Sequence, residues 1–321
     1  MPPLPGLRAS YVAPAHTLPD DALAYLAFGR DASLPADPRA FRIALAPLGA
    51  APLAELWRGA GSVEHGRDGD VVFAHDGAHL FGRLELGEHA AGGIERVADA
   101  AYRRALAFTR ASGFTHLVRI WNYFDAINAG ADDDERYRRF CVGRAAALAE
   151  AYPPERLPAA TAIGREGPGS TLQLYWIATR TAGRAVENPR QQSAYSYPRR
   201  YGPVAPSFSR AMALDQRLLL ISGTASVVGH LTNHVGDALA QLDETLANFE
   251  SLCEAASRVD PAIPPRLTAT SLLKVYLRDA TVYDAVRRTL EARLPAGCRP
   301  LYLRGDICRA DLLIEIDAVH C

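Results

Sequence analysis

Glu315 is the side chain in this sequence best suited to donate a proton. It lies between Ile314 and Ile316 in an apolar run, residues 312–319, that is typical of a buried β-strand. Successive side chains of a strand point to opposite faces, so Glu315 points away from both isoleucines. An apolar environment raises the pKa of a carboxyl group, which can then act as a general acid near neutral pH. The alternative from pattern alone is a strand residue that faces solvent.

Cys308 lies seven residues before Glu315. Taken alone, it is most simply a small buried apolar residue. Arg304 and Arg309 could lower the pKa of its thiol, but nothing in the local sequence requires a thiolate. The chain has five cysteines, an odd number, and no CxxC spacing. We therefore expect free thiols in a reducing cytoplasm.

Arginines must form any anion-binding site, because Lys274 is the only lysine. The guanidinium fork suits planar carboxylates. Arg144 lies in the middle of a predicted helix, in an otherwise apolar stretch at 141–147, so it needs an anion or an acidic neighbour as partner. Arg210 follows a turn at 206–209, where it binds an anion or is a charge at the surface.

Two tyrosines could donate hydrogen bonds to a carboxylate beside an arginine. They are Tyr195 and Tyr201, with the neighbouring Tyr197 as an alternative, as Arg200 is for Arg210. Their other interpretation is core packing with the hydroxyl at the surface. Asn122, at the end of a predicted strand, is a weaker candidate for the same role.

Gly223 ends a predicted strand at 218–223 and, with Ala225, could form one wall of a pocket. Gly223 is expected to be a turn residue. A glycine also leaves space for a ring against the backbone. Ala225, two residues later, could line the same wall.

The sequence contains no motif for a metal, a nucleotide or a serine triad. His230 and His234 are four residues apart but lack an HExxH context, and Gly229 and Gly236 argue against a helix there. The glycine-rich strings at 87–93 and 164–169 lack the strand–GxGxxG–helix context, and no GxSxG elbow occurs. We expect neither a metal nor a cofactor.

Composition excludes several classes of protein. The chain has 321 residues, 49% of them hydrophobic, and a formal net charge of −1. A neutral balance argues against nucleic-acid or membrane-surface binding, because both favour a basic face. No run of 18 apolar residues occurs, and the proline-rich residues 1–10 do not resemble a signal peptide. We expect a cytoplasmic protein.

Periodicity predicts an α+β fold that positions these residues. Helices are expected at 93–112, 133–152, 237–257 and 282–293, with an acidic cap at Asp132–Asp134. Strands are expected at 115–122, 170–180, 218–223, 270–278, 300–304 and 311–320. Prolines and glycines at 153–169 predict a boundary between a domain at 1–155 and one at 156–321. The helix–strand–helix order occurs in both, which suggests two related units.

The C-terminal half resembles the RidA (YjgF) family. The residues that carry the resemblance are Tyr201-Gly202-Pro203, Leu220-Ile221-Ser222-Gly223-Thr224, Leu273-Lys274-Val275-Tyr276-Leu277 and the strand around Glu315. RidA-like proteins are trimers with pockets between subunits. The resemblance implies two RidA/YjgF-like (chorismate mutase-like) units packed around a central cleft. A fused pair could replace the oligomeric pocket with an internal one, so we expect a monomer.

The whole chain resembles the chorismatases, a RidA-derived family that cleaves chorismate. The supporting segments are Arg119-Ile120-Trp121-Asn122-Tyr123, Phe140-Cys141-Val142-Gly143-Arg144, Glu187-Asn188-Pro189-Arg190-Gln191 and Ser222-Gly223-Thr224-Ala225-Ser226. In that family, the aromatising enzymes have a cysteine seven residues before the essential glutamate. Cys308 and Glu315 match this spacing.

The resemblance implies conversion of chorismate to 3-hydroxybenzoate, with or without 4-hydroxybenzoate, and pyruvate, without a cofactor. Glu315 would protonate the enolpyruvyl methylene and Cys308 would favour aromatisation. Arg144, Arg210 and Tyr201 would bind the two carboxylates. Two alternatives remain. One is a hydrolase that releases a dihydroxycyclohexadiene carboxylate. The other is a non-catalytic or imine-deaminase RidA relative that binds a small carboxylate.

Overall fold

The computed structural model describes residues 6–49, 53–165, 170–215 and 217–321. Within these residues, the first strands form a four-stranded sheet, the N-terminal sheet, in the order β1-β4-β2-β3. The strands are β1 (Arg8–Val12), β2 (Ala22–Phe28), β3 (Ala40–Ile43) and β4 (Ala54–Arg58).

A seven-stranded sheet follows, in the order β18-β9-β8-β10-β7-β6-β5. Its strands are β5 (Glu64–Asp68), β6 (Val71–His75), β7 (His79–Gly87), β8 (His116–Asp125), β9 (Ala159–Arg165), β10 (Thr171–Thr179) and β18 (Asp306–Ile307). The helices α1 (Glu88–Ala91), α2 (Ile94–Ala111) and α3 (Arg136–Ala149) connect its strands. Ile94, Val97 and Ala101 are buried at helical spacing in α2, as predicted.

A six-stranded sheet contains most of the C-terminal half, in the order β11-β12-β13-β19-β16-β17. Its strands are β11 (Arg184–Val186), β12 (Ala211–Leu214), β13 (Leu218–Ala225), β16 (Leu272–Leu277), β17 (Leu301–Arg304) and β19 (Ile314–His320). A hairpin, β14 (Val227–Val228) and β15 (Leu231–Thr232), precedes the helices α4 (Ala238–Val259) and α5 (Tyr283–Glu291). The Asp237 side chain caps α4 by accepting hydrogen bonds from the backbone N–H groups of Leu239 and Ala240.

The two larger sheets repeat one topology, which confirms the α+β class. In the first, β8 pairs in parallel with β9 and antiparallel with β10, and β10 pairs with β7. In the second, β16 pairs in parallel with β17 and antiparallel with β19, and β19 pairs with β13. A helix precedes and follows the strand at the corresponding place in each unit, α2 and α3 in one and α4 and α5 in the other.

The division between the sheets does not coincide with the predicted boundary at 155. The strands β9 and β10 come after residue 155 but pair with β8 and β7 of the first unit. Of the prolines and glycines that predicted a linker, Pro153, Pro154 and Pro158 precede β9 and Gly164 lies within it, while residues 166–169 lie outside the described part of the chain. By sheet membership, the second unit begins at β11.

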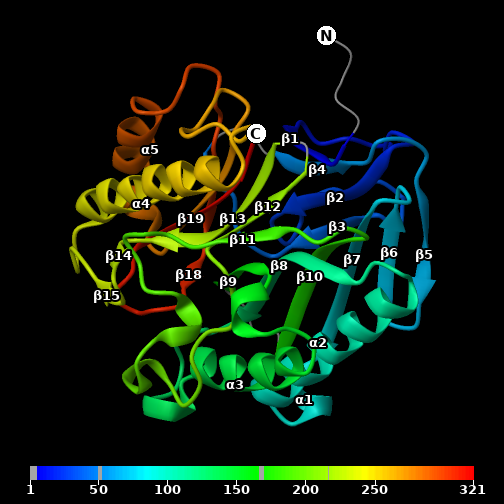
Figure 1. Cartoon of the computed structure of the whole chain (residues 1–321), viewed down its shortest axis with the longest axis horizontal. Coiled ribbons are helices and arrows are strands. Elements are labelled where there is room, and N and C mark those ends of the chain that lie inside the picture. Colours follow the sequence, from blue (N-terminus) through cyan, green and yellow to red (C-terminus); the bar gives the residue numbers. More distant parts are fainter. Residues whose placement is uncertain (1–5, 50–52, 166–169, 216) are drawn as a thin grey trace.

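The sheets lie between two outer pairs of helices, α2 with α3 and α4 with α5 (Figure 1). One apolar cluster fills the space between the sheets and includes Trp57, Trp121 and Tyr276, one from each sheet. The rings of Trp57 and Trp121 meet edge to face at 5.8 Å.

Short 3₁₀ turns complete the described chain, at Asp132–Asp134, Pro154–Arg156, Ala194–Ser196, Arg199–Tyr201 and Ala280–Val282. The three aspartates form a turn of their own. Glu135, and not an aspartate, is the N-cap residue of α3, and its side chain makes no capping hydrogen bond. The prediction of an acidic cap at Asp132–Asp134 was wrong. Across the described ranges, no helix is long and apolar enough to span a membrane.

Candidate active site

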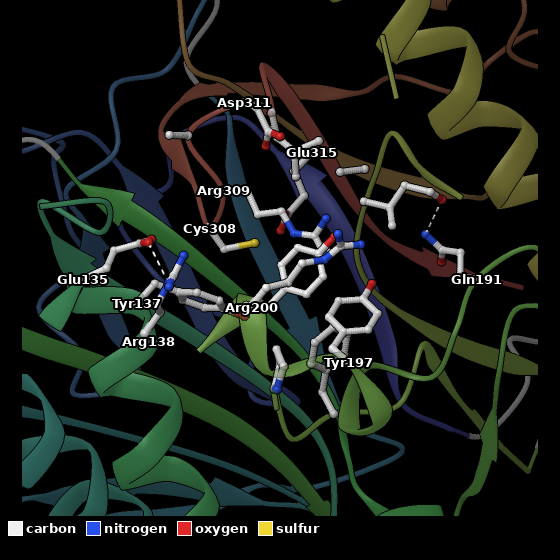
Figure 2. A pocket seen from close by; sticks show the side chains of 18 of the residues that line it. Glu135, Tyr137, Arg138, Gln191, Tyr197, Arg200, Cys308, Arg309, Asp311 and Glu315 are labelled. Carbon is white, nitrogen blue, oxygen red and sulfur yellow. Dashed lines mark hydrogen bonds and ion pairs between the residues drawn. The ribbon is translucent and has the colours of Figure 1, made fainter. Parts of the chain in front are cut away.

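A cavity of about 360 Å³ opens between the two units (Figure 2). It collects side chains from the start of α3, the segment between β11 and β12, the end of β13, the loop after β18 and the start of β19. The lining residues are Glu135, Tyr137, Arg138, Gln191, Tyr197, Arg200, Tyr201, Pro206, Phe208, Arg210, Gly223, Ala225, Val227, Cys308, Arg309, Ala310, Asp311, Leu312 and Glu315.

Glu315 reaches this cavity because of the alternation of β19. Ile314 and Ile316 pack in the cluster beneath α4 and α5, so the residue between them faces the other unit. On either side, β19 pairs Glu315 with Ala225 and with Tyr276. The side chain is 4% exposed, so the solvent-facing alternative is wrong.

The Glu315 carboxyl retains its proton at neutral pH. Burial and, to a smaller extent, the charge of Asp317 raise its pKa to about 8, against the opposing effects of Arg119, Arg210 and Arg278. The hydrogen bonds found among the described residues include none to this carboxyl. A neutral, unengaged carboxyl at a cavity wall can donate its proton to a bound molecule.

Gly223 makes room for that carboxyl. The pairing of β13 with β19 shifts register between Ile221 and Thr224, which places Gly223 in a bulge beside Glu315. A Cβ atom on Gly223 would overlap the carboxyl and come within 2.7 Å of its Cδ. The space that we expected a substrate ring to use is thus occupied by Glu315. Ala225 lines the same wall, as predicted.

Cys308 projects into the cavity from the loop between β18 and β19. Two anchors position this loop. Ile307, in β18, pairs with Ile163 at the edge of the seven-stranded sheet. The Arg278 guanidinium donates hydrogen bonds to three backbone oxygens of the loop, those of Ile307, Arg309 and Leu312. These anchors explain how a separation of seven residues brings Cys308 and Glu315 to one cavity.

The Cys308 thiol is neutral at physiological pH. Burial raises its pKa to about 12, with a smaller contribution from Glu315, while Arg309 opposes the shift. Nucleophilic cysteines need a lowered pKa. Cys308 therefore has no thiolate character, and Figure 2 shows its sulfur pointing toward the arginine and tyrosine side chains of the cavity.

Arg210 provides a buried guanidinium with unused hydrogen-bonding capacity. Its Nη2 donates to the Tyr197 hydroxyl at 2.6 Å and to the backbone oxygen of Gln192 at 2.8 Å. Its buried Nε has no hydrogen-bond partner within the described residues, while its backbone N–H donates to the Glu187 carboxylate at 3.3 Å. Such a group can bind a carboxylate. Tyr197, one of the alternatives considered, is the tyrosine that contacts it.

Tyr201 lines the cavity with its ring and not with a free hydroxyl. The hydroxyl donates to the His230 backbone oxygen at 2.6 Å. Arg309 lies over the Tyr201 ring at 4.2 Å and Arg200 at 5.2 Å. The predicted role as a carboxylate donor would require the hydroxyl to leave His230.

The three remaining candidates are absent from the described lining. Arg144 is buried behind the lining residue Phe208, with its guanidinium 5.9 Å from that ring, and no carboxylate pairs with it among the described residues. The Asn122 amide accepts from Tyr102 and donates to the Thr161 backbone, inside the core. Tyr195 packs against the cluster beneath α2 and α3.

Arg309 is the main lining residue that sequence reasoning did not identify as part of the site. Its Nη1 donates to the His230 backbone oxygen and to the Thr232 hydroxyl, at 2.9 and 3.1 Å. Its position next to Cys308 was the available signal. Gln191, in the segment without periodicity, offers a buried Oε1 that has no partner within the described residues.

No group of three or more histidine, cysteine, aspartate or glutamate side chains suited to a metal ion occurs in the described ranges. The site is therefore defined by a neutral carboxyl, a neutral thiol and guanidinium groups. Such a set can protonate a substrate and bind its carboxylates.

Comparisons with known proteins point to one family. Residues 55–178 match the family model described as chorismatase FkbO/Hyg5-like, N-terminal. A 3-hydroxybenzoate synthase of Streptomyces hygroscopicus is 37% identical over 284 residues, 84% of this chain and 82% of the relative. A chorismatase of Streptomyces rapamycinicus is 39% identical over 279 residues, 83% of this chain and 81% of the relative.

A solved structure agrees with the sequence comparisons. The crystal structure of a chorismatase superimposes with a TM-score of 0.87 at 33% identity, covering 98% of each chain. The likeness therefore extends over both units and the cavity between them.

Proposed function

The chain belongs to the chorismatase family, and we propose that it converts chorismate to 3-hydroxybenzoate and pyruvate. One observation carries the proposal. A carboxyl that remains protonated at neutral pH, Glu315, and a buried guanidinium with an unused Nε, Arg210, line the same cavity. Chorismate has the two matching groups, an enol ether that accepts a proton and carboxylates that accept hydrogen bonds.

Glu315 begins the reaction by protonating the terminal methylene of the enolpyruvyl group. The resulting oxocarbenium carbon accepts the oxygen of a water molecule, and its bond to the ether oxygen then breaks to release pyruvate. The ring keeps the C3 oxygen, loses its C4 hydroxyl and its C3 proton as water, and becomes aromatic. One water is added and one is lost, so chorismate equals 3-hydroxybenzoate plus pyruvate. This balance makes the enzyme a lyase.

Arg210 binds one substrate carboxylate through its guanidinium group, with the Tyr197 hydroxyl beside it. Arg309 supplies a second guanidinium at the cavity wall. Arg144 adds a positive charge behind Phe208 and remains the proposed partner of the other carboxylate. These guanidiniums lower the cost of bringing a dianion out of water.

Cys308 directs the outcome toward the aromatic product. The nearby Cys308 and Glu315 are both neutral before reaction, and after proton donation Glu315 is a carboxylate beside a thiol. A thiol in that position can pass or accept a proton while the ring loses its C4 hydroxyl.

The first experiment is incubation of the purified protein with chorismate, with products resolved by chromatography and mass detection. We expect 3-hydroxybenzoate and an equal amount of pyruvate. A second peak of 4-hydroxybenzoate would place the protein in a dual-product branch. A dihydroxycyclohexadiene carboxylate would show a hydrolase, and no pyruvate at all would refute cleavage of chorismate.

Two substitutions separate the proposed roles. Glu315→Gln removes the acid, and we expect pyruvate release to fall at least about a hundredfold. Cys308→Ala should retain pyruvate release but shift the product toward the dihydroxy acid. Cys298→Ala is the matched control, because Cys298 is also a partly buried free thiol but does not line this cavity. Equal product ratios in the two cysteine variants would refute the role of Cys308.

A further inference from the structure

A cluster of four buried charges lies directly behind the cavity. Its members are Glu55 from β4, Arg119 from β8, Lys274 from β16 and Asp317 from β19. None is more than 2% exposed. Lys274 Nζ lies 2.8 Å from Glu55 and 3.9 Å from Asp317. Arg119 Nη2 lies 3.4 Å from Asp317 Oδ2. Two anions and two cations give the cluster no net charge.

Asp317 is the most heavily bonded member of this cluster. Its Oδ2 accepts hydrogen bonds from three side chains, those of Tyr276 at 2.8 Å, Thr161 at 3.1 Å and Trp121 at 3.2 Å. The donors come from β16, β9 and β8, so this carboxylate joins the two units. A carboxylate buried at this depth is stable only with such partners.

Asp317 and Glu315 lie two residues apart on β19 and therefore project from the same face. Asp317 carries the nearest negative charge on that face, and like charges oppose each other's ionisation. The pKa of Glu315, raised first by burial, is raised next by Asp317. The charge behind the cavity thus acts on the carboxyl that faces it.

Thr161 provides a second, mechanical connection between Asp317 and Glu315. Its hydroxyl donates to Asp317 and accepts from the backbone N–H of Gly223 at 3.0 Å. Arg119 Nη2 also donates to this hydroxyl, at 2.6 Å. Gly223 is the residue whose missing side chain makes room for the Glu315 carboxyl. The position of Asp317 therefore fixes the backbone against which Glu315 rests.

We propose that Asp317 is a positioning residue that acts on Glu315. Asp317 holds the Gly223 bulge through Thr161, and its negative charge opposes loss of the Glu315 proton. The role assigned to Asp317 rests on the proposed acid chemistry of Glu315. Lys274 lies closer to Glu55 than to Asp317, at 2.8 Å against 3.9 Å.

Other charged groups also act on Glu315, and the proposal includes them. Arg119 of β8, Arg210 before β12 and Arg278 after β16 favour its ionised form. Cys308, from the loop after β18, interacts electrostatically with Glu315 when its thiol is ionised, but the thiol is neutral below its own pKa of about 12. Asp317 is the carboxylate whose charge acts on Glu315 in the opposite direction. Its loss should therefore favour the ionised form of Glu315.

The first test is the pH dependence of kcat in Asp317→Asn, a variant that keeps the shape of the side chain. The activity of an acid catalyst falls as its proton is lost, so the wild-type rate should decline near pH 8. In the variant we expect this decline about one pH unit lower, which makes kcat about fivefold smaller at pH 8 than in the wild type, with almost no difference at pH 6. A folded variant with the wild-type profile would overturn the proposal.

Thr161 supplies a pair of variants that does not alter the charge. Thr161→Val removes the hydroxyl and keeps the branched shape, and Thr161→Ser keeps the hydroxyl. We expect Val to lower kcat about tenfold with little change in KM, and Ser to restore most of it. If Asp317→Asn does not fold, the two Thr161 variants test the positioning role without it. Equal kcat values for Val and Ser would overturn the positioning role.

Infrared spectroscopy gives a readout that needs no turnover. The C=O stretch of the protonated carboxyl, assigned by its loss in Glu315→Gln, should disappear near pH 8 in the wild type and about one unit lower in Asp317→Asn. An unshifted titration refutes the effect of Asp317. A shifted titration in a protein that releases no pyruvate from chorismate would support the electrostatic effect and refute the proposed function.

Discussion

Glu315 is buried in an environment that disfavours its charged form, and this has a cost in stability. Its pKa is raised to about 8 from an ordinary value of 4.5, mainly by burial. The folded state therefore holds a proton that the unfolded chain loses above about pH 4.5. The contribution of that proton to the free energy of unfolding is complete below about pH 4.5 and is lost as the pH rises toward 8.

Replacement of Glu315 by Gln should therefore stabilise the protein in a pH-dependent way. We expect equal stability of variant and wild type near pH 4 and a gain of roughly 2 to 4 kcal/mol for the variant above pH 8. Urea unfolding at pH 4, 6 and 8.5 measures the difference. A difference that stays constant over this range would show that the carboxyl titrates normally in the folded state.

Cys308 should react slowly with alkylating reagents although it lines a cavity. Only a thiolate reacts, and burial keeps the pKa of this thiol near 12. Under native conditions at pH 7.5, iodoacetamide should modify the exposed Cys321 well before Cys308. Peptide mapping by mass spectrometry measures both rates. Labelling of Cys308 as fast as Cys321 would contradict a neutral thiol.

The bulge in β13 is the element on which the placement of the acid depends. Gly223→Ala adds a methyl group where the Glu315 carboxyl lies, so the carboxyl must move. We expect kcat to fall about a hundredfold while the protein remains folded, because small misplacements of a catalytic group are costly. Gly61→Ala is the control, since its added Cβ would have no neighbour within 4 Å. Equal activity of the two variants would show that the bulge is unimportant.

Elements with local signals were predicted well. The helix α2 was evident from the spacing of Ile94 and Val97, and the strand β19 from the apolar run around Glu315. The strand β9 was missed, because its alanine-rich sequence is short and lies between prolines and glycines. It is a strand because β8 pairs with it, a contact that no local pattern encodes.

The candidate site shows the same pattern: residues with a local sequence signal were identified, and those whose role depends on contacts distant in sequence were not. Glu315, Cys308, Arg210, Tyr201, Gly223 and Ala225 were identified and lie at one cavity. Arg309 was not, because its role depends on the hairpin at His230, far away in sequence. Asn122 looked available at the end of a strand, but Tyr102 and Thr161 use both ends of its amide.

The whole molecule encloses its cavity within one chain. Residues of α3 in the first unit and of β13 and β19 in the second line the same space. The site is thus complete without a second copy. We propose a monomer, and sedimentation equilibrium should give a mass near 34.7 kDa at all concentrations. A concentration-dependent trimer would contradict this.

The neutral cluster behind the cavity also constrains how the sequence can diverge. Loss of any one of Glu55, Arg119, Lys274 or Asp317 leaves an unmatched charge in the core, which is strongly destabilising. A viable lineage must therefore change these positions in compensating pairs, such as 55 with 274, or replace the set with apolar side chains. Across homologous sequences the four columns should covary, although the residues are scattered over more than 260 positions of the chain. Correlated substitutions at these four positions would then identify the cluster from sequences alone.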